Sequence, residues 1–306
     1  MARVPQAGRV RRQVLELPDG YATEVYFWPP AGIPAGLPVV YLHGIQSHPG
    51  WFSGSAEHLA CLGYPVWQPT RRGSGGNAAG RGHASSAGQL LDDVAAACRA
   101  ASADSGGRRV HLIGVSWGGK LAACFACLRR AELAGCRGQA GMPDQAGAPD
   151  VEVVSLTLVC PGVAPRIDIG PLTKLAVAAS LVCCPRRPFD IPLNQVELFT
   201  DNETMRDYLR RDACRLHSAT AAFMFASRQL DRILARAGQG CLRMPVTLIL
   251  AERDRIIDND ATRRTVARLA GDRLETRLLP GCHTLEFEPD PQPLHRALAD
   301  SLARAR

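Results

Sequence analysis

Ser116 stands between two glycines in the segment Arg109-Val-His-Leu-Ile-Gly-Val-Ser-Trp-Gly-Gly-Lys120, which gives Gly114-x-Ser116-x-Gly118. A short apolar run, 110–113, precedes this motif, and a helix-compatible run, 120–130, follows it. A serine on a sharp strand-to-helix turn exposes its hydroxyl above a sheet, and glycines let neighbouring backbone pass close by. The alternative is a glycine-rich turn that holds an ordinary serine. The strand before the motif and the helix after it favour a nucleophilic Ser116.

A nucleophilic serine needs a general base, and the base needs an acid that orients it. His283 is the best candidate among the eight histidines, because it follows a predicted strand, 274–279, in Pro-Gly-Cys-His-Thr. Two histidines on predicted loops, His48 and His83, are the rivals. The other five are expected to shape a loop (His43), to lie in the core (His111) or to lie on helical segments (His58, His217 and His295).

The orienting acid should also follow a core strand. Asp254 comes directly after the predicted strand 246–250, in Ala-Glu-Arg-Asp. Glu252 is a weaker alternative, and Asp258 and Asp260 lie near a predicted helix start, where aspartate is a common N-cap.

The oxyanion that forms during acyl transfer needs two preorganised N–H donors. One donor should be the amide of Trp117, which follows the nucleophile at the start of a helix. The other should come from the loop after the predicted strand 37–42, where His43-Gly44 places the amide of Ile45.

The composition is that of an ordinary globular protein. Hydrophobic residues make up 46% of the 306 residues, charged residues 21%, and the net charge is +7. The basic residues are scattered or paired, and no basic tract is interleaved with aromatic residues. This pattern argues against nucleic-acid binding and leaves attraction to an anionic membrane surface open. No feature of the sequence indicates an oligomeric state.

The cysteines predict a reducing compartment. There are 11, and their spacing resembles neither a zinc site nor a small disulfide framework. Cys124 and Cys127 are three residues apart on a predicted helix, as buried free thiols would be. The basic N-terminus, 1–13, has no apolar core, and no run is long enough to span a bilayer. We therefore expect a cytoplasmic protein without a metal or an organic cofactor.

Apolar strands alternate with helical segments along most of the chain, which predicts an α/β fold with a mostly parallel sheet covered on both faces. Two strands should flank a turn at Pro18-Asp19-Gly20. Further strands are expected over 37–42, 65–68, 110–113, 151–159, 246–250 and 274–279, and helices over 54–63, 87–101, 120–130 and 294–304, with a surface loop over 139–150.

The segment 164–242 does not continue this alternation of strands and helices. Its pattern is helical, with helices expected over 172–182, 205–209 and 221–235, and it lies between two core strands. We expect a helical lid over the C-terminal edge of the sheet, where ligands bind in open α/β folds; the alternative is a simple extension of the domain. The domains are then 1–163 (first part of the core), 164–242 (cap) and 243–306 (second part of the core).

An apolar stretch, 172–184, lies inside this cap and is too short to span a bilayer. We expect it to form the core of the cap; the alternatives are a channel for an acyl chain or a face that contacts lipid. Arg166, Arg186 and Arg187 flank it and would suit a carboxylate or a phosphate, although arginine at a helix end is also ordinary.

These residues together resemble the α/β-hydrolase superfamily, in the branch of the monoacylglycerol lipases, lysophospholipases and serine aminopeptidases. The resemblance rests on His43-Gly44, the Arg71–Gly75 loop, Gly114–Gly118, 251–258 and 281–283. It implies an α/β-hydrolase fold, a triad of Ser116, Asp254 and His283 in the Ser…Asp…His order of this class, and an oxyanion hole of Ile45 and Trp117. In one departure, Thr70 and Arg71 precede Arg72 where many relatives have an aspartate in D-x-R-G-x-G.

The expected activity is hydrolysis of a carboxylic ester through an acyl-enzyme, on a small and partly apolar acyl substrate such as a monoacylglycerol or a lysophospholipid. An acyltransferase, a C–C bond hydrolase or a peptidase would use the same triad. A non-catalytic ligand-binding relative is a different class, and such proteins often lose a triad residue. A serine at position 116 excludes the aspartate nucleophile of the dehalogenases and epoxide hydrolases of this fold.

Overall fold

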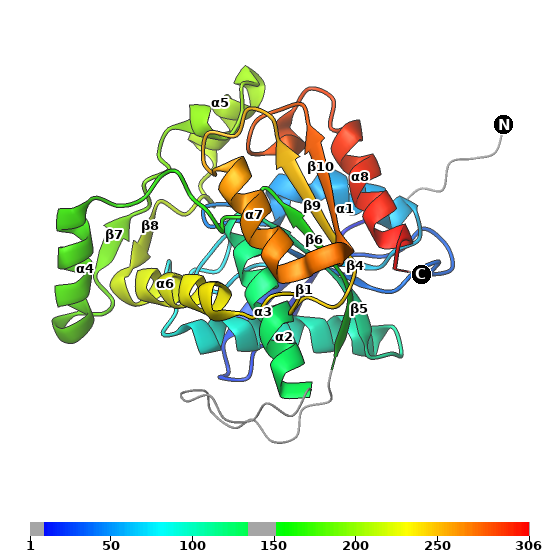
Figure 1. Ribbon diagram of the computed structural model, residues 1–306, viewed down its shortest axis with the longest axis horizontal. Helices are drawn as coiled ribbons and strands as arrows, with labels where there is room; N and C mark the ends of the chain where they lie inside the picture. The colour runs from blue at the N-terminus through cyan, green and yellow to red at the C-terminus, as the bar shows by residue number, and fades with distance from the viewer. Residues whose placement is uncertain (1–8, 134–150, 306) are drawn as a thin grey trace.

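A mostly parallel sheet of eight strands forms the centre of the protein, in the order β1-β2-β4-β3-β5-β6-β9-β10 (Figure 1). The computed structural model describes residues 9–133 and 151–305. The surface loop predicted over 139–150 lies outside these residues. β2 runs antiparallel to both of its neighbours, and the remaining strand pairs are parallel. The predicted α/β class with a mostly parallel sheet is confirmed.

The central strands are buried on both faces, which is why they appear in the sequence as continuous apolar runs. Every residue of β3, β4 and β9 is buried. The strands are β1 (Arg11–Glu16), β2 (Ala22–Trp28), β3 (Val39–Leu42), β4 (Val66–Pro69), β5 (Arg109–Val115), β6 (Glu152–Val159), β9 (Val246–Ala251) and β10 (Leu274–Leu279). All eight lie where the sequence predicts strands.

Helices cover both faces of this sheet. α1 and α8 pack against each other on one face, and α2 and α3 pack together on the other, where α7 also contacts β9 and β10 (Figure 1). These helices are α1 (Ser53–Cys61), α2 (Ala87–Asp104), α3 (Trp117–Leu133), α7 (Asn259–Ala270) and α8 (Gln292–Ala303), with single 3₁₀ turns η1 (Pro49–Phe52), η3 (Gly271–Arg273) and η4 (Leu285–Phe287).

Side chains cap two of these helices in the way that their sequences indicate. The Ser86 hydroxyl accepts a hydrogen bond from the Gln89 amide at the start of α2, at 3.1 Å. The Asp258 carboxylate accepts one from the Ala261 amide at the start of α7, at 2.8 Å, which confirms Asp258 as an N-cap. Cys124 and Cys127 are buried on α3, as their spacing predicts.

A mainly helical segment is inserted between β6 and β9 and lies at one side of the molecule (Figure 1). It consists of α4 (Pro171–Cys183), β7 (Pro188–Asp190), η2 (Val196–Leu198), α5 (Glu203–Arg211), β8 (Ser218–Thr220) and α6 (Ala221–Arg236). The three helices match the prediction. The antiparallel pair β7–β8 was not predicted, because three residues are too few to show alternation. His217 precedes β8 and is not on a helix, which corrects that prediction.

None of the described helices combines the length and the apolar composition that crossing a bilayer requires.

Candidate active site

Ser116 occupies the single residue between β5, which ends at Val115, and α3, which begins at Trp117. Its backbone is in the left-handed region, with φ of 54°. This conformation is costly for a non-glycine residue and persists only where the surroundings enforce it. The two flanking glycines are required by close contacts: a Cβ on Gly118 would lie 2.4 Å from the His43 carbonyl oxygen, and one on Gly114 would lie 2.6 Å from the Gly118 carbonyl oxygen.

The structure brings Ser116 together with the histidine and the aspartate that the sequence singles out. The His283 Nε2 atom lies 2.9 Å from the Ser116 Oγ atom, and the His283 Nδ1 atom lies 2.8 Å from Asp254 Oδ2. His283 is 2% exposed and Asp254 is 7% exposed, so water competes little for these bonds. The three side chains come from the ends of β5, β9 and β10, which meet at the C-terminal edge of the sheet.

His48 and His83, the other candidates for the general base, form hydrogen bonds away from Ser116. His48 Nε2 lies 3.1 Å from a carboxylate oxygen of Asp212, and His83 Nδ1 lies 3.0 Å from the Thr220 hydroxyl. His111 is buried in β5 beside Ser155, which confirms its place in the core.

Backbone amides hold the Asp254 carboxylate in place. Its Oδ1 atom accepts hydrogen bonds from the amides of Ile256 and Ile257, at 2.8 Å and 3.0 Å, which leaves Oδ2 for His283. Burial acts to raise the pKa of Asp254, but His283 and these amides outweigh it, and the pKa is lowered from its ordinary value. A charged Asp254 accepts a hydrogen bond from the Nδ1–H group of His283, so the unprotonated Nε2 atom faces Ser116 as a proton acceptor.

The loop after β3 lies directly beside the nucleophile. A Cβ on Gly44 would stand 3.3 Å from Ser116 Cβ, so only glycine fits there without crowding the serine. The ring of His43 donates from Nδ1 to the Gly44 carbonyl, at 2.9 Å, and accepts at Nε2 from the Arg71 amide, at 2.9 Å. Because the C=O and N–H of a trans peptide point in opposite directions, this bond orients the Ile45 amide. The Trp117 amide is at the start of α3, where N–H groups have no acceptor within the helix.

A cavity of about 290 Å³ opens beside the nucleophile. It is lined by Gly44, Ile45, Gln46, Ser47, Trp51, Phe52, Val115, Ser116, Leu193, Phe199, His283 and Thr284. Most of this wall is apolar, and no carboxylate is among these residues. A larger hollow of about 460 Å³ lies under the loop of Arg71 and Arg72, and none of Ser116, Asp254 and His283 lines it.

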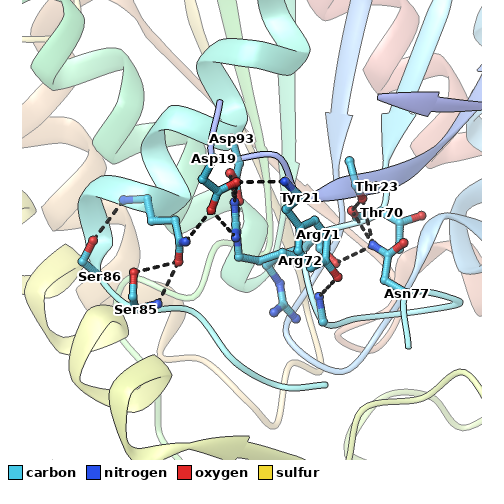
Figure 2. A network of polar contacts seen from close by, with 12 residues as sticks. Asp19, Tyr21, Thr23, Thr70, Arg71, Arg72, Asn77, Ser85, Ser86 and Asp93 are labelled. Carbon is cyan, nitrogen blue, oxygen red and sulfur yellow. Dashed lines mark hydrogen bonds and ion pairs between the residues drawn. The ribbon is translucent and has the colours of Figure 1, made fainter. Parts of the chain in front are cut away.

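The arginine of the R-G-x-G loop is fixed by two acids that the sequence did not single out. The guanidinium of Arg72 binds Asp93 on α2, at 2.6 Å, and Asp19 in the turn between β1 and β2, at 2.9 Å (Figure 2). The Arg72 hydrogen bond lowers the pKa of Asp19 to about 2. Thr70, two residues before Arg72, accepts a hydrogen bond at its backbone carbonyl from the side-chain amide of Asn77, at 3.2 Å. Asp19 and Asp93 are 53 and 21 positions from Arg72 in the chain, so no local sequence pattern indicates these two ion pairs.

Two clusters of the described residues have atoms close enough to hold a metal ion: His48, Asp212 and Cys214, and Cys160, Asp254 and His283. In each cluster the histidine already hydrogen-bonds the carboxylate, so these groups are satisfied without an ion. Burial and the nearby Asp254 carboxylate raise the pKa of the Cys160 thiol, which keeps it protonated and a poor ligand.

Comparison with known proteins gives the family. The model of the family described as serine aminopeptidase, S33, matches residues 35–290. No curated protein sequence matches the chain. A soluble variant of monoglyceride lipase from Saccharomyces cerevisiae is similar in structure, with a TM-score of 0.75 and 17% identity over 97% of this chain and 98% of that chain.

Two further solved structures are similar at the same low identity. The monoacylglycerol lipase of Paleococcus ferrophilus has a TM-score of 0.69 and 17% identity, over 98% of this chain and 100% of that chain. A thermophilic esterase from Thermogutta terrifontis has a TM-score of 0.64 and 17% identity, over 96% and 99%. At this identity the structures show the shared fold, and the family model shows the family. The chain has the α/β-hydrolase fold, which it shares with the monoacylglycerol lipases, and it belongs to the family described as serine aminopeptidase, S33.

Proposed function

We propose that the protein is a serine hydrolase that cleaves a carboxylic ester through an acyl-enzyme. The observation that carries this proposal is the continuous hydrogen-bonded chain from the Ser116 hydroxyl through His283 to Asp254, with bonds of 2.9 Å and 2.8 Å. Nucleophile, base and orienting acid within hydrogen-bond distance of one another are the arrangement that acyl transfer to serine requires.

In this mechanism Ser116 Oγ attacks the ester carbonyl carbon while His283 Nε2 takes the hydroxyl proton. The amides of Ile45 and Trp117 donate to the oxyanion of the tetrahedral intermediate. His283 then gives its proton to the leaving alcohol oxygen, the C–O bond of the ester breaks, and the acyl group stays on Ser116. A water molecule, deprotonated by His283, releases the acid and restores the serine.

The cavity supports a partly apolar acyl group. Ile45, Phe52, Val115, Leu193 and Phe199 form much of its wall beside Ser116. Leu193 and Phe199 belong to the segment inserted between β6 and β9, so this segment contributes to the substrate site. We propose on this basis that 164–242 is a cap over the catalytic edge and that 1–163 and 243–306 form the catalytic core.

The same wall favours an ester over a peptide with a free N-terminus. An aminopeptidase must recognise the α-ammonium group of its substrate, which requires a carboxylate or several oxygen acceptors. None of the residues that line the cavity beside Ser116 is acidic. We therefore place ester hydrolysis ahead of aminopeptidase activity, although the family model carries the name of the latter.

The outer helix of the cap, α4, presents an apolar surface, and only Val177 and Ser180 of it are buried, so the expectation that this stretch forms the core of the cap was wrong. Leu172, Leu175 and Val182 are 80%, 68% and 91% exposed. The exposed Arg186 and Arg187 follow the helix directly. Apolar side chains next to cations are suited to a lipid surface with anionic headgroups. We propose that α4 contacts the membrane or the lipid aggregate that holds the substrate.

Labelling with a fluorophosphonate probe, followed by assays on p-nitrophenyl esters of increasing chain length, tests the catalytic proposal. Wild type should be labelled and should hydrolyse the esters, and Ser116→Ala should lose both activities while it keeps the wild-type circular dichroism spectrum. Aminoacyl p-nitroanilides and added alcohols in the same assays separate a peptidase and an acyltransferase. A folded wild type that neither reacts with the probe nor hydrolyses any ester would overturn the proposal in favour of a binding protein.

A further inference from the structure

The loop after β3 carries two buried polar groups that have no hydrogen-bond partner among the described residues. They are the Gln46 amide nitrogen, Nε2, and the Ser47 hydroxyl. Gln46 is 1% exposed and Ser47 is 3% exposed, and both line the cavity that holds Ser116. Leaving a buried donor unpaired costs about 1–3 kcal/mol, so unpaired donors at the wall of a site indicate a group that the substrate supplies.

Arg215 determines which end of the Gln46 amide is free. Its Nε and Nη2 atoms donate to Gln46 Oε1, at 3.1 Å and 2.9 Å. A guanidinium has donors only, so the atom of Gln46 that faces it must be the oxygen. The NH₂ group is therefore the unpaired end. Arg215 is 3% exposed and has no ion pair with a carboxylate among the described residues. Its positive charge withdraws electrons from the Gln46 carbonyl, which makes the NH₂ group a stronger donor.

The two unpaired groups lie close to the nucleophile. A Cβ built on Gly44 would be 3.2 Å from the Ser47 hydroxyl oxygen and 3.7 Å from the Ser116 Oγ atom. The two oxygens are therefore at most about 7 Å apart, so a substrate bound at Ser116 can reach the Ser47 hydroxyl.

A second cation, the half-buried Arg71, contacts the same loop. Arg71 Nη2 donates to the Ile45 carbonyl, at 2.6 Å, and its guanidinium stacks on the rings of Trp117 and Phe223, at 5.1 Å and 4.9 Å. Among the described residues it has no carboxylate partner, and its Nε and Nη1 atoms are unpaired. Two guanidinium groups therefore contact the loop, Arg71 at Ile45 and Arg215 at Gln46, and their field favours a negatively polarised or charged group in the cavity.

We infer that Gln46 and Ser47 form a subsite that binds an oxygen acceptor of the substrate, a carboxylate or a carbonyl, close to the scissile ester. Arg215 is a positioning residue for this subsite, because it acts through Gln46. The inference rests on the proposed serine hydrolase function and narrows its substrate class. The substrate is then an ester with a second oxygen group a short distance from the bond that is cleaved.

Two series of matched esters test this inference in the intact protein. One series consists of three p-nitrophenyl esters whose acyl chains have the same length and differ at the far end. The chain ends in a carboxylate (adipic acid), a methyl ester (monomethyl adipate) or a branched alkyl group. The other consists of acetate esters of alcohols that end in the same three groups. The variable end group is thus on the acyl side of the ester in the first series and on the alcohol side in the second. We expect kcat/KM to be at least about tenfold higher for an oxygen-bearing end than for the alkyl end in one series. The ratio of carboxylate to methyl ester identifies which oxygen group is preferred.

Gln46→Glu is the diagnostic variant, because it keeps an oxygen on Arg215 and replaces the free NH₂ donor by a second oxygen. In this variant, the ratio of kcat/KM for the carboxylate-ended ester to kcat/KM for the alkyl-ended ester should fall about 10- to 100-fold. Ser47→Ala should reduce the preference independently. Gln292→Glu, the same substitution at the exposed first residue of α8, should leave it unchanged.

The outcomes separate this inference from the proposed function. If Ser116 reacts with the fluorophosphonate and the alkyl esters are cleaved as well as the oxygen-bearing ones in both series, the subsite is wrong and the hydrolase stands. A preference that survives both Gln46→Glu and Ser47→Ala also overturns the subsite. If neither labelling nor turnover occurs, the proposed function itself fails.

Discussion

The Nδ1 atom of His43 lies 2.9 Å from the carbonyl oxygen of Gly44, in the loop that passes beside Ser116. The Nε2 atom of the same ring accepts a hydrogen bond from the Arg71 amide, so both ring nitrogens have partners and the proton is fixed on Nδ1. Burial and the neighbouring Arg71 hold the pKa of His43 well below its ordinary value, so the ring stays neutral. This histidine fixes the peptide between Gly44 and Ile45, whose amide we propose as an oxyanion donor.

His43→Ala should therefore lower kcat by about 100-fold with little change in KM, because a displaced oxyanion donor weakens the transition state more than the bound substrate. Steady-state kinetics on a p-nitrophenyl ester measure both constants. A thermal unfolding curve controls for loss of structure. An equal rise in KM without a fall in kcat would show that the loop binds substrate and does not position a donor.

Asp254→Asn should reduce kcat by about 10⁴-fold, because an asparagine amide facing His283 Nδ1 would stabilise the wrong ring tautomer. The amides of Ile256 and Ile257 already occupy the other oxygen, so the new NH₂ group has little choice but to face the ring. Single-turnover acylation kinetics check the loss. Asp258→Asn, at the N-cap of α7, is the matched control and should keep kcat. Comparable losses in both variants would remove Asp254 from its proposed role.

Arg72→Met should destabilise the protein by about 3–5 kcal/mol, because it leaves the largely buried carboxylate of Asp93 without its partner. Urea unfolding at neutral pH measures the change. Arg12→Met is the control: its ion pair with Glu24 is on the surface, where Arg12 is 66% exposed, and the expected loss is about 1 kcal/mol or less. Similar losses in both variants would contradict a structural role for the Arg72 network.

The stabilisation that Asp19 contributes should disappear in acid. Its bond to Arg72 lowers the pKa of Asp19 from 3.8 to about 2, so the folded state holds the proton less tightly than the unfolded state. The contribution is complete above the unfolded value of 3.8 and fades as the pH falls toward 2. The difference in free energy of unfolding between wild type and Asp19→Asn should follow this course. A difference that stays constant across this range would show that the Arg72 bond does not persist in solution.

Leu172→Ser combined with Val182→Ser should weaken binding to vesicles that contain anionic lipid, because both side chains on α4 are exposed and apolar. Cosedimentation measures this binding, and activity on emulsified long-chain esters should fall in parallel. Hydrolysis of a water-soluble short-chain ester is the control and should not change. Equal vesicle binding by wild type and variant would exclude α4 as the contact surface.

The sequence determined the elements and the three candidate catalytic residues that the structure brings together. Ser116 was recognisable because two glycines, a preceding apolar run and a following helix are local requirements of a strand-to-helix turn. Asp254 and His283 were recognisable because each follows a core strand, and the ends of parallel strands meet at one edge. The α/β class, the positions of the strands and the burial of Cys124 on α3 follow from periodicity and composition in the same way.

Only the tertiary structure decided which distant groups meet. Asp19 and Asp93 converge on Arg72 from a turn and from α2, and Arg215 reaches Gln46 across 169 positions of the chain. No local pattern encodes such contacts, because they depend on how the inserted segment and the loops lie over the sheet edge. The short β7–β8 pair went unpredicted for a related reason: three residues per strand carry no periodic signal, and the two strands pair only when the inserted segment folds on itself.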